Sequence, residues 1–280
     1  MDRIGVITDE ISEDFEHALA VCSELGIREI ELRSVWNTSI VELDDEDLGK
    51  VEALLRDGGF ATCGIASPFL KCHIHGDGEA AGRTHSASAT SRDEQWDILA
   101  RSLEIAERLG APLVRAFSFW RLEDPTSVRD EILDTLLDAT ERVEKAGKLL
   151  GLENEHACNI ATGKEAAWYL DRIPNRTLGL IWDPGNIAAL GVQPTADEFH
   201  AIASRIHHVH LKDAVSLDER DGFTVLGEGV VDWPLHLKLL AEAGYDGVLS
   251  LETHFRHEGD GEPATRACAA ALESMLERVG

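Results

Sequence analysis

Three carboxylates and one imidazole occupy comparable places in the second half of the chain. Each ends or follows a short apolar run, and these residues are Glu153, Asp183, His210 and Glu252. If their side chains meet at one point, they repel one another unless a cation neutralises them. A divalent ion with oxygen and nitrogen ligands supplies that charge, and Mn²⁺, Mg²⁺, Co²⁺ and Zn²⁺ all suit this mixture. The absence of cysteine from the set argues against a structural zinc site.

Each residue also has an ordinary interpretation. A strand-end glutamate often serves only in a salt bridge, Asp183 can start a turn in its Asp-Pro-Gly sequence, and His210 can be a core histidine. Glu155 lies two residues after Glu153, so both can face inward, and Glu155 remains the alternative ligand. We expect Glu153 because the strand ends there. His208 and His210 share a face, and the outermost one, His210, is expected to reach the metal.

The apolar pattern predicts the elements that would bring these residues together. Short β-branched runs predict strands at 3–8, 27–32, 60–66, 112–117, 149–153, 178–182, 206–211 and 247–252. Longer runs with helical periodicity predict helices at 13–25, 45–57, 93–109, 126–147, 163–171, 195–203, 233–243 and 263–279. This alternation without a linker predicts an α/β, single-domain (β/α)₈ TIM barrel over residues 1–280, with the four residues at the mouth. The first turn carries no glycine, which disfavours a dinucleotide-binding sheet.

Composition narrows the class of partner. The formal net charge is −26, so we expect no binding to nucleic acid, whose phosphates such a surface repels. A carboxylate-rich surface is typical of halophilic proteins and also of merely acidic ones. No apolar stretch long enough for a membrane span and no secretory signal are evident, so a cytoplasmic location is expected. Five unpaired-looking cysteines predict free thiols.

One long irregular segment follows the third predicted strand, at residues 67–92. It is rich in glycine, serine, alanine and histidine, and it belongs on the side of a barrel that carries active-site loops. Loops of this length in compact domains are usually functional or disordered. We expect a flexible lid here, with a disordered insertion as the alternative.

At these residues the sequence resembles the sugar phosphate isomerase/epimerase superfamily, the xylose isomerase-like TIM barrels of the AP endonuclease 2 family. The resemblance rests on segments spread along most of the chain: 24–33, 152–156, 182–186, 208–213, 227–233 and 244–252. It implies the barrel and a metal site of Glu153, Asp183, His210 and Glu252. It also implies a homo-oligomer, a dimer or a tetramer.

The activity implied is a divalent-metal-dependent sugar or sugar phosphate isomerase or epimerase, with Mn²⁺ as the expected ion. In the ketose 3-epimerase branch the two ligand glutamates also act as acid and base, through a metal-stabilised enediolate. Carried over, Glu153 and Glu252 would be both ligands and proton carriers, and a small sugar or keto-polyol would be the substrate. The expected substrate contacts are Asn186, Lys212, His156, Lys71 and Trp120.

The chain departs from that branch at three polar positions. Asn186 stands where the branch has a histidine, Asn159 stands near its substrate-binding glutamate, and Ser216 stands near its arginine. Three other functions therefore stay open. A keto-inositol or dehydroshikimate dehydratase would share the proton abstraction and then expel hydroxide. An endonuclease IV-like hydrolase is disfavoured by the charge and by an expected lack of extra histidine and carboxylate ligands. A non-catalytic sugar-binding barrel is disfavoured by the two intact glutamates.

Overall fold

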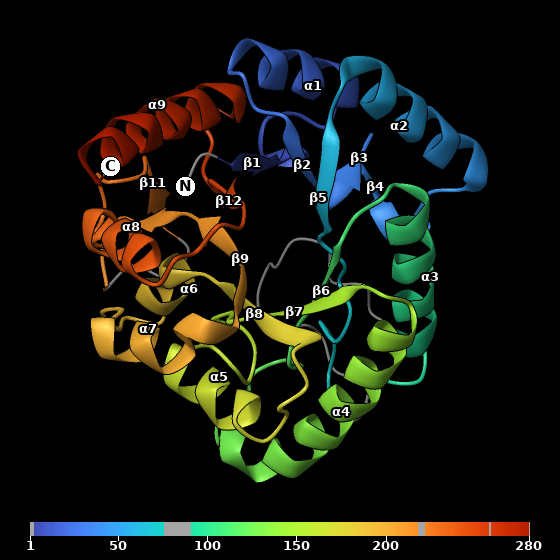
Figure 1. Cartoon of the computed structure of the whole chain (residues 1–280), viewed down its shortest axis with the longest axis vertical. Helices are drawn as coiled ribbons and strands as arrows, with labels where there is room; N and C mark the ends of the chain where they lie inside the picture. Colours follow the sequence, from blue (N-terminus) through green and yellow to red (C-terminus); the bar gives the residue numbers. More distant parts are fainter. Residues whose placement is uncertain (1–2, 76–90, 218–221, 258, 280) are drawn as a thin grey trace.

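Eight parallel strands close into a barrel in the computed structural model, which describes residues 3–75, 91–217, 222–257 and 259–279 (Figure 1). Around the barrel the order is β1-β12-β9-β8-β7-β6-β5-β2. The strands are β1 (Ile4–Ile7), β2 (Glu29–Leu32), β5 (Ala61–Ile65), β6 (Leu113–Ala116), β7 (Leu149–Glu153), β8 (Leu178–Trp182), β9 (Ile206–Leu211) and β12 (Leu249–Leu251). All eight predicted strands and the TIM barrel are thereby confirmed.

Helices surround the barrel, as Figure 1 shows. They are α1 (Phe15–Glu24), α2 (Asp45–Gly58), α3 (Gln95–Arg108), α4 (Arg129–Lys145), α5 (Gly163–Leu170), α6 (Pro184–Ala189), α7 (Ala196–Ile202), α8 (Trp233–Glu242) and α9 (Glu262–Val279). Short 3-10 turns occupy Thr8–Glu10, Ile40–Glu42, Pro125–Val128 and Ala203–Arg205. In the described part of the chain, no helix combines the length and apolar character that a membrane span requires.

The ends of α2 show how the sequence sets these helices. The Asp44 side chain accepts hydrogen bonds from the backbone N–H groups of Glu46 and Asp47, which caps the first turn. Gly59 then ends the helix with a φ of 68°, a left-handed conformation that glycine adopts without steric cost. Between the caps, the buried leucines and valine of α2 recur on one face and pack into the core.

Helix α6 and two small antiparallel hairpins were not predicted from the sequence. Helix α6 begins where the Asp-Pro-Gly sequence had suggested a turn. The Asp183 carboxylate accepts the Asn186 backbone N–H and Pro184 opens the first turn, so the turn residues continue into a helix. Two small hairpins also follow barrel strands at the mouth: β3 (Ser34–Val35) with β4 (Thr38–Ser39), and β10 (Asp213–Ala214) with β11 (Phe223–Thr224).

The predicted lid at 67–92 falls mainly on residues 76–90, which lie outside the described residues. Its first part is packed: Phe69, Leu70 and Cys72 are buried, and Phe119 and Trp120 donate backbone hydrogen bonds to it. The start of this segment is therefore an ordered loop, bonded to the segment that follows β6. The five cysteines are buried free thiols, as expected.

One buried histidine makes the stability of the fold depend on pH. His236 on α8 lies with its ring centroid 6.0 Å from those of Trp182 and Trp233. Neither of its ring nitrogens has a hydrogen-bond partner among the described residues. Burial lowers the pKa of His236 from 6.5 to about 4. Its neutral form is therefore the one that the fold accommodates.

We expect His236→Leu to make the free energy of unfolding less sensitive to acid. Because the pKa is depressed in the folded state, the unfolded chain binds the proton first, and stability falls as pH falls below 6.5. The wild type should lose about 2 kcal/mol more than the variant between pH 7.5 and pH 5. Urea unfolding at both pH values measures how much unfolding free energy each protein loses. A packing cost of the substitution that does not depend on pH is the same at both pH values and cancels. The exposed His200→Leu is the control, and equal losses in wild type and His236→Leu would contradict the expectation.

Candidate metal centre

Four side chains from neighbouring strands meet at the carboxyl end of the barrel. Glu153 ends β7, Asp183 follows β8, His210 lies near the end of β9, and Glu252 follows β12. These strands are consecutive around the barrel. Each residue offers one ligand atom, and the four atoms lie within 4.8 Å of one another, with all four side chains buried. The structure thus brings together the residues that the sequence had grouped.

The Nδ1 atom of His210 faces this group without a bonding partner. It lies 3.3 Å from Glu252 Oε2 and 3.6 Å from Glu153 Oε1, but it makes no aligned hydrogen bond among the described residues. Nε2 of the same ring lies 3.1 Å from both Glu31 carboxylate oxygens. A buried imidazole nitrogen without a partner, aimed at three carboxylates, fits a ligand of a divalent ion.

The pKa values of Asp183, Glu252 and His210 are shifted because several buried ionisable groups lie close together. Burial raises the pKa of Asp183 to about 6, and the nearby Glu252 and Glu153 add to the increase, whereas Lys212 opposes it. Burial also disfavours ionised Glu252, but Lys212, His254 and His210 hold the pKa of that carboxyl well below its usual range. Burial opposes protonation of His210, yet the surrounding glutamates raise the pKa of its imidazole well above 6.5. An ion bound at Nδ1 would displace a proton there.

The protein supplies some positive charge itself. Lys212 Nζ lies 2.7 Å from Glu252 Oε2 and 3.0 Å from Asp183 Oδ2, and Arg115 lies 3.1 Å from Glu153 Oε2. Arg33 contacts the remaining oxygen of Glu252 at 3.1 Å. The linked buried network contains five carboxylates and three cations: Asp9, Glu10, Glu153, Asp183 and Glu252 with Arg33, Arg115 and Lys212. Among these eight residues the carboxylates outnumber the cations by two, and a divalent cation would offset that difference.

Two further carboxylate–imidazole groups adjoin the centre. Glu31, His208 and His210 form one, and Glu10, Glu252 and His254 form the other. In the second group Arg33 already lies 2.6 Å from Glu10 Oε1, so a guanidinium occupies the place that a second ion would need. Extra histidine and carboxylate residues, which were expected to be lacking, do lie beside the centre. Closure of the barrel brings Glu10 after β1, Glu31 on β2 and His208 on β9 next to it.

The predicted substrate contacts lie around this centre. The Asn186 amide donates to Glu153 Oε1 at 3.0 Å and to Asp183 Oδ2 at 3.1 Å. His156 Nδ1 lies 3.1 Å from the Asn186 amide oxygen and 2.7 Å from Glu155 Oε1. Lys71 lies 3.4 Å from Glu155 and over the Phe117 ring. Glu155, the alternative ligand, is therefore absent from the four-residue group.

Trp120 and Asn159 stabilise the loops at the mouth of the barrel. The Trp120 side chain is buried with Phe117 and Cys158. The Asn159 amide donates to the carbonyl oxygens of residues 118–120, and its oxygen accepts the Leu122 N–H. In this chain Asn159 thus joins two loops, whereas the resemblance placed a substrate-binding glutamate there.

Sequence reasoning missed several residues that shape the centre. Arg33, Arg115 and Glu31 received no role, although each is a charged residue inside an apolar strand run or directly after one. Asn154 was also passed over. Its side chain accepts the Asp183 backbone N–H at 2.9 Å and donates to the Asp183 carbonyl at 2.7 Å. Asn154 therefore sets the spacing between the ends of β7 and β8.

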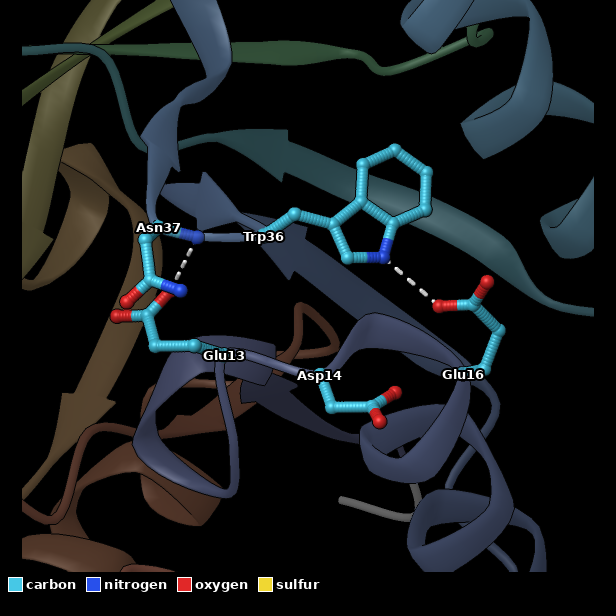
Figure 2. Close-up of a pocket in the computed structure, with 5 residues that line it drawn as sticks. All are labelled: Glu13, Asp14, Glu16, Trp36 and Asn37. Atoms are coloured by element: carbon cyan, nitrogen blue, oxygen red, sulfur yellow. Dashed lines mark hydrogen bonds between the residues drawn. The ribbon is translucent and has the colours of Figure 1, made fainter.

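A separate acidic concavity of about 600 Å³ lies at the rim, lined by Glu13, Asp14, Glu16, Trp36 and Asn37 (Figure 2). Glu13 accepts the Asn37 backbone N–H at 3.1 Å, and Glu16 accepts the Trp36 indole N–H at 2.8 Å. Glu13 and Glu16 therefore hold the β3–β4 hairpin in place, whereas Asp14 caps α1. None of them belongs to the four-residue centre.

The fold and donor set define a (β/α)₈ barrel with a candidate metal centre at its mouth. A model of the xylose isomerase-like TIM barrel family matches residues 19–277, and the chain belongs to this family.

The chain is similar to one curated protein in sequence and to two solved structures in fold. The inosose dehydratase of Lacticaseibacillus casei is 26% identical over 149 residues, which cover 46% of this chain and 50% of that protein. The chain thus spans about half the length of the curated relatives it matches. A zinc-bound IOLI protein has a TM-score of 0.80 at 17% identity, with 99% of each chain covered. A D-tagatose 3-epimerase-like protein has a TM-score of 0.77 at 20% identity, with 99% of this chain and 98% of that chain covered. At these identities the two structures show the shared fold.

Proposed function

We propose that this chain is a divalent-metal-dependent isomerase or epimerase of a keto sugar, a keto-polyol or their phosphates. The observation that carries the proposal is the unpartnered Nδ1 of His210 facing Glu153, Asp183 and Glu252 in a buried group. A purely structural cluster would be expected to satisfy that nitrogen. Membership of an enzyme superfamily that includes named dehydratases and epimerase-like proteins supports an enzymatic role.

The proposed ligands are Glu153, Asp183, His210 and Glu252. Three carboxylate donors and one imidazole suit Mn²⁺, our first choice, and also Mg²⁺, Co²⁺ or Zn²⁺. When bound, the ion would supply Lewis-acid stabilisation of negative charge on a substrate oxygen. Arg115 and Arg33 each hold one oxygen of a ligand glutamate. The other oxygen faces His210 and is also contacted by Asn186 in Glu153 and by Lys212 in Glu252.

The two glutamates would carry the proton. Removal of a proton next to a carbonyl needs a carboxylate that is ionised at neutral pH. Charged neighbours lower the pKa values of Glu252 and Glu153, although both side chains are buried. One glutamate would take the proton and the other would return it. Return to the opposite face of the same carbon inverts the stereocentre, as an epimerase does, and return to the neighbouring carbon shifts the carbonyl, as an isomerase does. Lys212, Asn186, His156, Lys71 and Trp120 stay the proposed substrate contacts, and Lys212 could polarise a carbonyl.

A dehydratase is the second candidate, and the likeness to an inosose dehydratase favours it. Both reactions begin with the same proton abstraction. In the lyase the electron pair then expels the hydroxyl group of the next carbon, which takes up a proton from a protonated carboxyl group and leaves as water, and no proton returns to the first carbon. Product analysis separates the two classes. We further propose a homodimer or homotetramer, as the family resemblance implies.

Deuterium exchange in D₂O tests the proposal. Ketoses, keto-inositols and their phosphates are incubated with Mn²⁺-loaded and metal-stripped protein, and NMR spectra are recorded after removal of Mn²⁺. We expect metal-dependent deuterium at a carbon next to the carbonyl, together with an epimer or aldose, or with a dehydrated enone for the lyase. Metal binding without exchange into any of these compounds would refute the proposed substrate class. Absence of metal binding would refute the site.

A further inference from the structure

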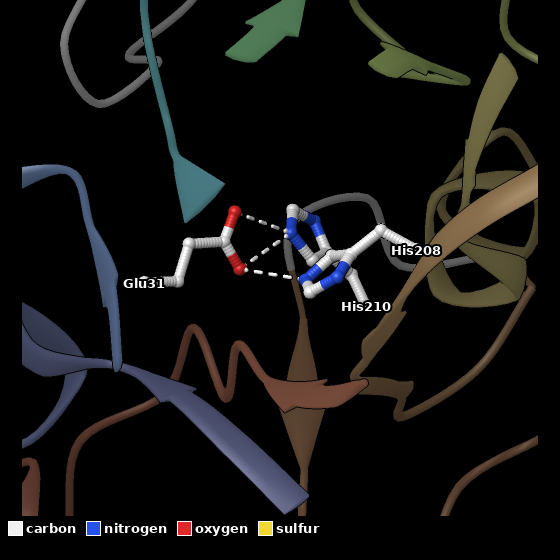
Figure 3. Close-up of side chains that lie close together, drawn as sticks. All are labelled: Glu31, His208 and His210. Atoms are coloured by element: carbon white, nitrogen blue, oxygen red, sulfur yellow. Dashed lines mark hydrogen bonds and ion pairs between the residues drawn. The ribbon is translucent and has the colours of Figure 1, made fainter. Parts of the chain in front are cut away.

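Glu31 receives three hydrogen-bond donors in the interior of the barrel, beside the candidate centre. His208 Nε2 lies 3.0 Å from its Oε2, and His210 Nε2 lies 3.1 Å from both oxygens (Figure 3). The Ser250 hydroxyl also donates to Oε2, at 2.7 Å. All four side chains are buried. A carboxylate only accepts hydrogen bonds, so each of these groups must present its hydrogen to Glu31.

This contact spans the barrel. Glu31 lies on β2, whereas the histidines lie on β9, and β1 and β12 separate these strands in the barrel order. Glu31 and His210 are 179 residues apart in sequence. The proposed mechanism gives Glu31 no part, although it is a buried charged side chain that touches a proposed ligand.

The geometry decides which His210 nitrogen is available. Because Nε2–H is committed to Glu31, its hydrogen cannot move to solvent or to another acceptor. Nδ1, the other ring nitrogen, is then the atom that faces Glu153 and Glu252. A carboxylate that fixes the tautomer and orientation of a metal-bound imidazole typically changes metal affinity by about 10–100-fold.

We propose that Glu31 is a positioning residue: it accepts the hydrogen bond from His210 Nε2–H and so orients Nδ1 of the same ring toward the metal. This inference rests on the proposed function, because it assumes the ion. His208 is the companion donor and not a ligand, since its Nε2 is bonded to the same carboxylate.

The Glu31→Gln variant tests this directly. Glutamine keeps the shape but offers one acceptor oxygen and an NH₂ donor to three groups that all donate. The NH₂ group then replaces one of the two oxygens that lie 3.1 Å from His210 Nε2, so this N–H loses one of its acceptors and faces a donor. The Mn²⁺ dissociation constant, measured by calorimetry, should rise about 10–100-fold. Ser250→Ala is the matched control, because it removes a contact of Glu31 and leaves His210 bonded. Its affinity should stay within about threefold, which is less than 1 kcal/mol.

A second measurement needs no variant. In protein labelled with ¹⁵N-histidine, long-range ¹⁵N–¹H spectra should show His210 protonated at Nε2 both without metal and with Zn²⁺, and bare at Nδ1 with Zn²⁺. A bare Nε2 in either state would overturn the inference, as would unchanged Mn²⁺ affinity in Glu31→Gln. If the wild type binds Mn²⁺ but never catalyses exchange, only the proposed function fails. If it binds no divalent ion, both fail.

Discussion

Replacing Glu252 with glutamine should slow metal-dependent deuterium exchange by about 10²–10⁴-fold, the usual contribution of a positioned acid or base. Glutamine can still occupy the buried position between Lys212 and Arg33, 2.7 Å and 3.1 Å from the two carboxylate oxygens. It cannot accept a proton from carbon at neutral pH. The exchange rate is measured by NMR at saturating Mn²⁺, so that weaker metal binding does not account for the loss.

Glu153→Gln should give the complementary result if two bases work on opposite faces. With one epimer as substrate, one variant should lose exchange, while the other should still exchange but form no epimer. Supplying the opposite epimer should reverse the two patterns. Glu13→Gln, in the rim concavity, is the control and should exchange at the wild-type rate. Full activity in both Glu153→Gln and Glu252→Gln would refute the proposed acid and base.

Asp183→Ala should abolish the stabilisation that a divalent ion gives to the wild type. An ion at 100 times its dissociation constant stabilises a folded protein by about 2.7 kcal/mol. Asp183 is fully buried, and burial raises its pKa to about 6, so its carboxylate gains more from a bound cation than an exposed one would. The measurement is the shift in thermal midpoint on adding Mn²⁺, together with calorimetric titration.

Asp183 also caps α6, and loss of a cap costs about 1 kcal/mol by itself. Asp183→Asn separates the two roles, because asparagine keeps the cap but removes the charge. We expect it to lose most metal affinity and little metal-free stability. Glu155→Gln tests the alternative ligand and should still be stabilised by Mn²⁺. Tight metal binding by Asp183→Ala would show that the ion lies elsewhere.

The sequence was sufficient to predict the barrel and to group the four central residues, because both inferences depend on local patterns. Alternating apolar runs identify strands and helices, and a barrel brings the carboxyl ends of consecutive strands to one mouth. Glu153, Asp183, His210 and Glu252 could therefore be grouped from their places at four strand ends. Helix α6 was missed because the same Asp-Pro-Gly residues begin a turn or a helix, and the Asn186 contact selects the helix.

Only the tertiary structure decided how charge is distributed around the centre. Barrel closure places Arg33 against Glu252 and Glu31 against His210, across 219 and 179 residues of sequence. It also separated Glu153 from Glu155, since side chains two residues apart share a face but need not share neighbours. The sequence alone determined which chemical groups reach the mouth. Their partners, and hence which oxygen or nitrogen remains for an ion, depended on contacts between distant strands that no local pattern encodes.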